Sequence, residues 1–539
     1  MNERRTPSTT HRTQDTRIDP LRSAVRRAVR LSAGVIAAGL VTGTAVAAPS
    51  APFPAVFPLA SLLPTHGGDG SAGFVLAGID SGDDSGISVS DAGDLNGDGL
   101  DDLLIGAFFA APGGRSFAGE TYVVFGRDTA QTGNFPAGFQ LASLFPAGGG
   151  DGSAGFVLAG IDPSDHSGRP VSAAGDVNGD GIDDLLIGAA GASPGGRAFA
   201  GESYVVFGRD TARAGNFPAV FQLASLLPDS GGDGSAGFVL TGIDSRDISG
   251  YSVSAAGDLN GDGLGDILIG APDRRSSAGE SYVVFGRDTA QAGNFPAVFP
   301  LASLLPAGGG DGSAGFVLAG IDAVDYSGIS VSAAGDLNGD GIDDLVIGAF
   351  DASPGGRTYA GESYVVFGRD TAQGGNFPAV FPLASLLPAD GGDGSVGFVL
   401  TGIDAGDNSG LSVSAAGDLN GDGLDDLLIG AEDAAPGGRT YAGESYVVFG
   451  RDTAQGGNFP AVFPLARLLP TGGGDGSAGF VLTGIEELDS SGFSVSGLGD
   501  LNGDGIDDLI IGGPDAGPGR YGAGESYVVF GRAALPGRP

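Results

Sequence analysis

Cysteine is absent from the 539-residue chain, and this absence excludes disulfide bonds, thiolate metal sites and cysteine nucleophiles. Histidine is almost as scarce, since the chain contains only His11, His66 and His166. His166 lies in a short turn whose counterparts elsewhere in the chain carry Asp, Ile, Tyr or Asn, so we interpret it as a solvated loop residue. The histidines therefore predict no catalytic site.

Serine catalysis has equally little support. The chain contains one Gly-x-Ser-x-Gly match, at residues 191–195, but Pro194 blocks the helix that follows a serine nucleophile in hydrolases. Paired carboxylates are too numerous for any one pair to be singled out as a glycosidase site. We find no catalytic residues and do not predict an enzyme.

Positive charge is also rare. Lysine is missing, and 26 basic residues face 65 acidic ones, which gives a formal net charge of −39. A nucleic-acid-binding protein needs a basic surface, so this balance argues against nucleic acid and against unassisted binding to anionic membranes. We expect part of the acidity to lie in metal-binding loops and part on a solvated surface.

The N-terminal residues resemble an export signal. Arg22, Arg26, Arg27 and Arg30 precede an apolar run over residues 31–46, which ends in Ala-Val-Ala-Ala. This layout predicts a cleaved signal peptide over residues 1–48, read by the general or the twin-arginine pathway. A membrane anchor is the alternative, but a short run rich in Gly, Ala and Thr makes a poor span. We expect a secreted or cell-surface protein whose mature chain does not enter the membrane.

One unit is repeated six times over residues 49–532, followed by a short tail at 533–539. The units begin near Phe53, Phe135, Phe217, Phe295, Phe377 and Phe459. Each starts with a Phe-Pro-Ala segment, which the flanking prolines predict to be a turn rather than a strand. Four strand-like runs follow, and in the first unit they cover residues 73–79, 86–92, 102–107 and 120–126.

Four short strands per unit, repeated six times, predict an all-β fold: a β-propeller of six four-stranded blades. An open solenoid is the main alternative, but it would need atypical capping repeats, which neither end shows. We expect each blade to take its outer strand from the next unit. Residues 73–79 would then complete the last blade, residues 492–531, and close the ring without exposed sheet edges.

The third unit is shorter than the others. Its segment 271–277 lacks four residues relative to the equivalent segment 107–117, which joins the third and fourth strands. Loops that vary on a constant scaffold are places where partners bind. Neutral sequence drift in an exposed turn is the alternative explanation for the shorter segment.

A nine-residue motif recurs in every unit, first as Asp-Leu-Asn-Gly-Asp-Gly-Leu-Asp-Asp at residues 94–102. Side-chain oxygens at positions 1, 3, 5 and 9, with the backbone carbonyl of position 7, form an oxygen-only set that suits Ca²⁺. We predict about six calcium ions, one per repeat. The predicted ligands are Asp94, Asn96, Asp98, Leu100, Asp102; Asp176, Asn178, Asp180, Ile182, Asp184; Asp258, Asn260, Asp262, Leu264, Asp266; Asp336, Asn338, Asp340, Ile342, Asp344; Asp418, Asn420, Asp422, Leu424, Asp426; and Asp500, Asn502, Asp504, Ile506, Asp508.

The first six positions of this motif also match the start of an EF-hand. An EF-hand needs a glutamate at position 12, carried by the exiting helix, whereas position 12 here is an isoleucine such as Ile105 within a predicted strand. We therefore predict a strand-loop-strand site closed by the position-9 aspartate.

The sequence strongly resembles the FG-GAP repeats of integrin α-chain β-propellers and their secreted bacterial relatives. The matching segments of the first unit are residues 85–90, 93–99, 102–107 and 119–126, and equivalents occur in all six units. The resemblance implies calcium held between the first two strands of each blade. Two features depart from integrins: six blades are predicted instead of seven, and all six loops are intact, except that Gly265 replaces the non-ligand aspartate at position 8.

These observations favour an adhesion or ligand-binding module for an extracellular protein or glycan, with calcium in a structural role. The alternative is a secreted calcium-dependent hydrolase or lyase acting on polysaccharide or phospholipid, because related repeats also occur in such enzymes.

Overall fold

The computed structural model describes residues 59–516 and 524–533. The predicted signal peptide and nearly all of the predicted tail lie outside these residues and stay predictions. Among the described residues, no helix has both the length and the apolar character required to cross a membrane.

The fold is an all-β propeller, and each internal blade takes its outer strand from the following unit, as predicted. In blade 1 the antiparallel order is β2, β3, β4 and then β6, which belongs to the second unit. The strands of the six sheets are β2 (Ser88–Gly93), β3 (Asp102–Ala107), β4 (Glu120–Val124) and β6 (Gly155–Ala159); β7 (Val171–Gly175), β8 (Asp184–Ala189), β9 (Glu202–Val206) and β11 (Gly237–Thr241); β12 (Ser252–Gly257), β13 (Asp266–Ala271), β14 (Glu280–Val284) and β16 (Gly315–Ala319); β17 (Ser330–Gly335), β18 (Asp344–Ala349), β19 (Glu362–Val366) and β21 (Gly397–Thr401); β22 (Ser412–Gly417), β23 (Asp426–Ala431), β24 (Glu444–Val448) and β26 (Gly479–Thr483); and β27 (Ser494–Gly499), β28 (Asp508–Gly513) and β29 (Glu525–Val529).

The stretch from the Phe-Pro-Ala segment to the Leu-Ala-Ser-Leu turn, predicted to be a turn, contains a short strand between these two motifs. This fifth strand runs parallel to the outer strand of blades 1 to 4. The proline at the end of strands such as β15 is tolerated there because that strand lies at the edge of its sheet. These strands are β10 (Val220–Gln222), β15 (Val298–Pro300), β20 (Val380–Pro382) and β25 (Val462–Pro464), and β1 (Val75–Ala77) pairs in the same way with β5 (Gly138–Gln140).

All helices of the described residues are single turns. The α-helices are α2 (Thr129–Thr132), α3 (Thr211–Ala214), α4 (Arg274–Ser277), α5 (Thr289–Ala292), α6 (Thr371–Gly374) and α7 (Thr453–Gly456). The 3₁₀ turns are η1 (Leu59–Leu62), η2 (Pro64–His66), η3 (Pro112–Gly114), η4 (Leu141–Leu144), η5 (Pro146–Gly148), η6 (Pro194–Gly196), η7 (Leu223–Leu226), η8 (Pro228–Ser230), η9 (Leu301–Leu304), η10 (Pro306–Gly308), η11 (Pro354–Gly356), η12 (Leu383–Leu386), η13 (Pro388–Asp390), η14 (Pro436–Gly438), η15 (Leu465–Leu468) and η16 (Pro470–Gly472).

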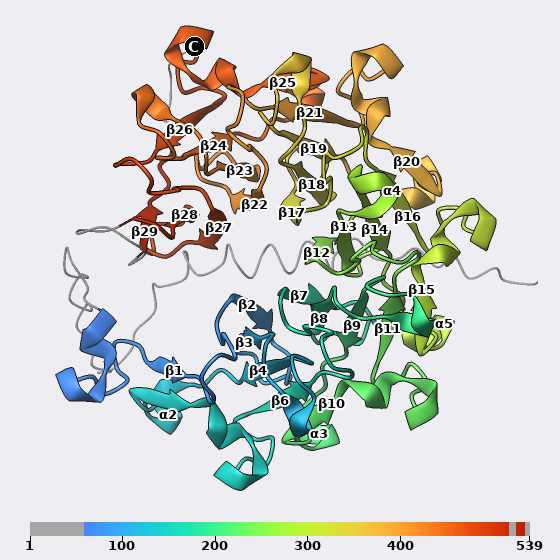
Figure 1. Cartoon of the computed structure of the whole chain (residues 1–539), viewed down its shortest axis with the longest axis vertical. Coiled ribbons are helices and arrows are strands. Elements are labelled where there is room, and N and C mark those ends of the chain that lie inside the picture. Colours follow the sequence, from blue (N-terminus) through green and yellow to red (C-terminus); the bar gives the residue numbers. More distant parts are fainter. Residues whose placement is uncertain (1–58, 517–523, 534–539) are drawn as a thin grey trace, which may run out of the picture. The chain divides into compact units, whose positions relative to one another are not determined.

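Successive blades pack face to face. Leu104 and Phe156 of blade 1 share an apolar cluster with Leu185, Ile187 and Tyr204 of blade 2, and the later joints repeat this arrangement. Each such side chain contributes about 1.5–3 kcal/mol through burial. Figure 1 shows the sheets following one another in chain order from blue to red.

The predicted closing pair is not among the strand pairs of the described residues. There β1 pairs with β5 alone and β29 with β28 alone, so closure of the ring stays a prediction. The exposed apolar faces of the two end blades support it. Val89 of β2 is 66% exposed and Leu103 of β3 is 38% exposed, whereas Leu185, the equivalent of Leu103 in blade 2, is fully buried against blade 1.

Closure can be tested with a cysteine pair, because the chain has no cysteine of its own. In blade 1, Thr121 lies opposite Leu158, and the equivalent closing pair is Ser526 opposite Leu76. A Leu76→Cys/Ser526→Cys variant should form an intramolecular disulfide on mild oxidation, detected by mass spectrometry of the monomer. The matched control is Thr121→Cys/Leu158→Cys. A disulfide in the control alone would contradict closure.

Candidate metal loops and the surfaces beside them

The six predicted metal loops all lie between the first two strands of their blades. In blade 2 the loop leaves β7 at Gly175, whose positive φ of 68° follows a register shift in the β7–β8 pair. Glycine at this position allows the chain to leave the sheet and turn sharply. Positions 1 to 7 of each motif thus lie on the loop and position 9 is the first residue of the next strand, while metal binding by these residues stays a prediction.

The position-1 aspartate holds the turn in shape. In blade 2, one carboxylate oxygen of Asp176 accepts hydrogen bonds from the backbone N–H groups of Gly179 (2.7 Å) and Asp180 (3.1 Å). The other oxygen accepts from Gly181 N–H at 2.8 Å. The carboxylate therefore organises the loop backbone around itself.

The position-9 aspartate is buried at the base of the loop. One carboxylate oxygen of Asp184 accepts from Gly208 N–H at 2.9 Å, and the other accepts from Val177 N–H at 2.9 Å. Burial raises the pKa of Asp184 well above its usual range, and the neighbouring Asp180 and Asp176 add to the rise. In blade 1, burial raises the pKa of Asp102 to about 7. A buried carboxylate in such a loop is stabilised in its charged form by a bound cation.

In two repeats the position-3 asparagine supplies a buried, unsatisfied oxygen. The side-chain amide of Asn260 donates to Asp266 at 3.3 Å, while its Oδ1 atom is buried and accepts no hydrogen bond from the described residues. Asn96 has the same arrangement. Buried polar atoms normally have a partner, so this oxygen fits a ligand to a hard cation.

The loops do not have the compact geometry of an ion-bound site. No group of three or more Asp, Glu or His side chains within residues 59–516 and 524–533 is arranged to hold a metal ion. The position-1 and position-9 carboxylates are directed at backbone N–H groups instead. The donor chemistry fits calcium, and the five positions lie within one turn.

The position-8 aspartate has a role that the ligand analysis missed. Asp183 of the second repeat accepts a hydrogen bond at 3.0 Å from the backbone N–H of Asp94, the first residue of the preceding loop. The same contact joins the later loops, with distances of 2.8 to 2.9 Å, through Asp343, Asp425 and Asp507. One signal was visible: position 8 is aspartate in five of six repeats although it is no ligand.

The third repeat lacks this side-chain contact because Gly265 has no carboxylate. There the backbone N–H of Gly265 donates to the carbonyl oxygen of Asp176 at 2.9 Å. The equivalent distance from Asp183 to Asp94 is 3.4 Å, so the two backbones approach more closely where glycine stands.

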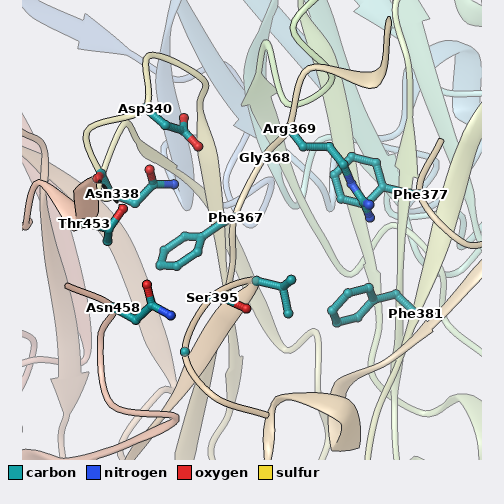
Figure 2. Close-up of a pocket in the computed structure, with 12 residues that line it drawn as sticks. Asn338, Asp340, Phe367, Gly368, Arg369, Phe377, Phe381, Ser395, Thr453 and Asn458 are labelled. Carbon is teal, nitrogen blue, oxygen red and sulfur yellow. Dashed lines mark hydrogen bonds between the residues drawn. The ribbon is translucent and has the colours of Figure 1, made fainter. Parts of the chain in front are cut away.

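A pocket of about 250 Å³ adjoins the fourth metal loop (Figure 2). Asn338 and Asp340 of the loop line one side, and Arg369 lies over the ring of Phe377, 4.0 Å from its centroid. The next blade closes the pocket through Thr453, whose backbone N–H donates to the carbonyl oxygen of Asn338 at 2.9 Å. A related pocket of about 540 Å³ lies beside the first loop.

A second acidic cluster lies at the opposite end of each blade. In blade 2, Glu202 at the start of β9 accepts a hydrogen bond from the Tyr204 hydroxyl at 2.8 Å, and Asp165 lies nearby. Burial raises the pKa of Glu202 to about 7, and the charges of Asp165 and Asp162 add to the rise. Glu362 repeats this environment in blade 4.

The shortened hairpin of the third unit changes this cluster. Arg274 of α4 forms ion pairs with Glu280 (2.9 Å), Asp247 (2.7 Å) and Asp244. In the second unit Arg197 instead donates to the carbonyl oxygen of Gly242 at 3.1 Å. The four missing residues therefore place a guanidinium group directly on the acidic cluster of that blade.

Exposed aromatic residues accompany the acidic clusters. Phe117, Phe199, Tyr359 and Tyr441 occupy equivalent positions in the β3–β4-type hairpins, each is 46–49% exposed, and each has a φ between 53° and 57°. Left-handed backbone is unfavourable for a bulky residue and often marks a functional position. These side chains form an exposed aromatic set at the end of the blades away from the metal loops.

The interpretation of His166 as a solvated loop residue was wrong. His166 is half-buried among Phe108, Phe109 and Phe117, with ring centroids 5.7 to 6.3 Å away. Burial lowers the pKa of His166, and the charge of Arg169 lowers it further. The turn that carries His166 packs onto the hairpin because the His166 N–H donates to the Phe117 carbonyl at 3.0 Å.

The position-8 contact predicts a stability effect. Asp183→Ala leaves the backbone N–H of Asp94 without its acceptor and should lower the free energy of unfolding by about 1–3 kcal/mol, measured by urea denaturation. Asp183→Asn retains an acceptor oxygen and is the matched control. If Asp183→Ala and the wild type have equal free energies of unfolding, this hydrogen bond does not contribute to stability.

The buried glutamates predict a pH dependence. Their pKa of about 7 lies above the ordinary value of 4.5, so the folded state retains protons that the unfolded state releases. Their stabilising contribution is complete below about pH 4.5 and is lost as the pH rises through about 7. The variant Glu202→Gln/Glu362→Gln should therefore gain about 1–3 kcal/mol per site over the wild type between about pH 5 and about pH 8. If the difference in unfolding free energy between the variant and the wild type is the same at both pH values, the assignment of raised pKa values to these glutamates is contradicted.

The comparisons with known proteins agree with the repeat structure. The FG-GAP repeat model matches six segments, at residues 88–124, 170–206, 249–284, 327–366, 409–448 and 491–529. Integrin alpha-5 of Xenopus laevis is 28% identical over 294 residues, which cover 53% of this chain and 21% of the integrin. Phosphatidylinositol-glycan-specific phospholipase D of Bos taurus is 30% identical over 208 residues, which cover 36% of this chain and 21% of that protein.

The matches thus span about a fifth of the length of these relatives. Each matched segment contains three strands of one blade together with its metal loop. The chain is therefore an FG-GAP repeat protein with an integrin α-like β-propeller.

Proposed function

We propose that this protein is an exported, calcium-stabilised adhesion or ligand-binding module whose partner is an extracellular protein or glycan. The proposal rests on one observation: the metal loops and the exposed aromatic side chains lie at opposite ends of the blades. The metal loops recur at one end of every blade, and exposed aromatic side chains recur at the other. One end of the blades is thereby stabilised, while the other end presents groups to a partner.

The proposed calcium ligands are the 30 loop residues named in the sequence analysis. The carboxylates at positions 1, 5 and 9, the asparagine Oδ1 at position 3 and the carbonyl at position 7 would hold one ion per loop. A bound ion would supply positive charge beside the buried position-9 aspartate. Its role in this proposal is structural, since the first five loops also contact the following blade.

Binding is favoured over catalysis by the local structure of the one serine motif. Ser193 precedes the 3₁₀ turn η6, and its hydroxyl oxygen accepts a hydrogen bond from the backbone N–H of Phe199 at 3.1 Å. This arrangement differs from the strand-turn-helix elbow of serine hydrolases. The phospholipase relative is matched over about a fifth of its length, so its named activity is not transferred to this chain.

The aromatic set suits both kinds of partner. Aromatic rings provide a large contact area with little loss of side-chain entropy, and neighbouring carboxylates accept hydrogen bonds from hydroxyl or ammonium groups. Repeated sites on successive blades would also add avidity for a repeating ligand.

Calcium binding predicts a measurable stoichiometry and a stability effect. We expect about six Ca²⁺ per chain by calorimetry, and a fall in Tm on chelation, because each ion at 100 times its Kd adds about 2.7 kcal/mol. Asp344→Asn should remove one site, whereas Asp229→Asn, an exposed aspartate outside the loops, should remove none. A Tm that is the same with and without chelator would contradict the structural role.

The binding proposal is tested by applying the calcium-loaded protein to cells and to a glycan array. The fourfold variant Phe117→Ala/Phe199→Ala/Tyr359→Ala/Tyr441→Ala should lose binding to cells and to neutral glycans while it keeps its calcium stoichiometry. Arg213→Ala, in an exposed position on α3, is the control. No binding by the wild type to either surface would count against an adhesion or ligand-binding function.

A further inference from the structure

The pocket in Figure 2 contains a cation whose charge is unmatched. Arg369 leaves blade 4 directly after β19, and its guanidinium group lies over Phe377. Within the described residues, its guanidinium group makes no hydrogen bond and no ion pair. Arg369 is partly buried, and this burial lowers its pKa because no acidic group opposes the effect.

Equivalent arginines in other units provide an internal comparison. Arg127, Arg287 and Arg451 each donate a hydrogen bond to a neighbouring asparagine carbonyl, at 3.1 to 3.2 Å, and lie 4.8 to 5.1 Å from their phenylalanine rings. Arg209 behaves like Arg369: its guanidinium group lies 4.1 Å from the Phe217 centroid and also makes no hydrogen bond to the described residues. In two of these five sites, the guanidinium group therefore makes no hydrogen bond or ion pair with the described residues.

Unpaired arginine is unexpected in a chain with a net charge of −39. Acidic residues are abundant, yet none forms an ion pair with Arg369 among the described residues. The nearest acid that lines the pocket is Asp340, whose carboxylate accepts from Ile342 N–H at 3.0 Å within the metal loop. A calcium ion in that loop would offset its charge and leave Arg369 as the unmatched charge of the pocket.

The shape and polarity of the pocket limit the ligand. Its volume of about 250 Å³ suits one sugar residue rather than a peptide segment. Asn458 and Ser395 line it opposite the loop, and Val396 adds an exposed apolar side chain where the other described blades have alanine. A mixed polar and apolar wall beside a cation fits a ring that carries hydroxyl groups and one anionic group.

We propose that the pocket at Arg369 binds the carboxylate of an acidic sugar residue, such as a uronic acid unit of a polysaccharide, and that the equivalent guanidinium group of Arg209 offers a second contact of the same kind. The planar guanidinium fork matches a carboxylate through two parallel hydrogen bonds. The inference goes beyond the proposed function, because it adds a separate site for one class of glycan at the metal-loop end, apart from the exposed aromatic set.

The test uses the calcium-saturated full chain and three soluble probes: D-glucuronate, D-glucose and acetate. Calorimetry or saturation-transfer NMR should show binding of glucuronate, with glucose and acetate each at least about tenfold weaker, because each lacks either the charge or the ring. Equal affinity for glucose would overturn the carboxylate assignment. Equal affinity for acetate would overturn the sugar assignment, and no binding of glucuronate would overturn both.

Matched variants connect the binding to the two arginines. Arg209→Gln/Arg369→Gln should weaken glucuronate binding at least about tenfold, whereas Arg127→Gln/Arg287→Gln should leave it within about twofold. The more conservative variant Arg209→Lys/Arg369→Lys keeps the positive charge but loses the two parallel N–H donors of the guanidinium group. It should bind glucuronate with an intermediate affinity and have an unchanged Tm. Equal losses in the two glutamine variants, or full affinity in the lysine variant, would overturn the assignment.

The outcome is separable from that of the proposed function. If glucuronate does not bind while the protein still binds cells or neutral glycans, the pocket proposal is wrong and the adhesion proposal stands. If glucuronate binds at these arginines but no cell or array ligand is found, the adhesion proposal fails and the pocket assignment stands.

Discussion

The contact between a metal loop and the following blade, present at the first five loops, is the constraint on which the rest of the structure depends. A loop residue such as Asp94 donates its N–H to a carboxylate 89 residues later in the sequence. The next chain segment adds Thr211, which donates to the carbonyl of Asn96 at 3.0 Å. The loop is thus both a candidate ion site and a joint between neighbouring sheets. Changes in its charge act on the packing between blades as well as within one.

This joint explains why so much acid is tolerated in so small a space. Three loop carboxylates lie within nine consecutive residues, and the position-8 carboxylate of the next repeat contacts the backbone N–H of the first of them. Backbone N–H groups satisfy several of their oxygens, as they do for Asp176 and Asp184. Hydrogen bonds lower the cost of these charges, and a bound divalent ion would offset their mutual repulsion.

Much of the fold was predictable because its signals are local. The apolar Leu-Leu-Ile runs predicted the buried strands β3, β8 and β23, and the glycine and aspartate spacing placed the loops between the correct strands. The contact of Asp183 with Asp94 was not predictable, since it depends on the packing of two blades. The half-buried environment of His166 likewise depends on Phe117, which lies 49 residues earlier in the chain. The fifth strand was missed because Pro300 suggested a turn, although a sheet edge accepts it.

The glycine at position 265 has a mechanical consequence. Four of the five blade joints in the described residues are held by a carboxylate-to-amide hydrogen bond, and the joint between blades 2 and 3 is not. Cooperative units of a repeat protein separate where the coupling between neighbours is weakest. The joint between blades 2 and 3 instead relies on the backbone hydrogen bond from Gly265 and on the apolar cluster that the two blades share. Under tension or partial denaturation, we therefore expect blades 1 and 2 to separate from blades 3 to 6.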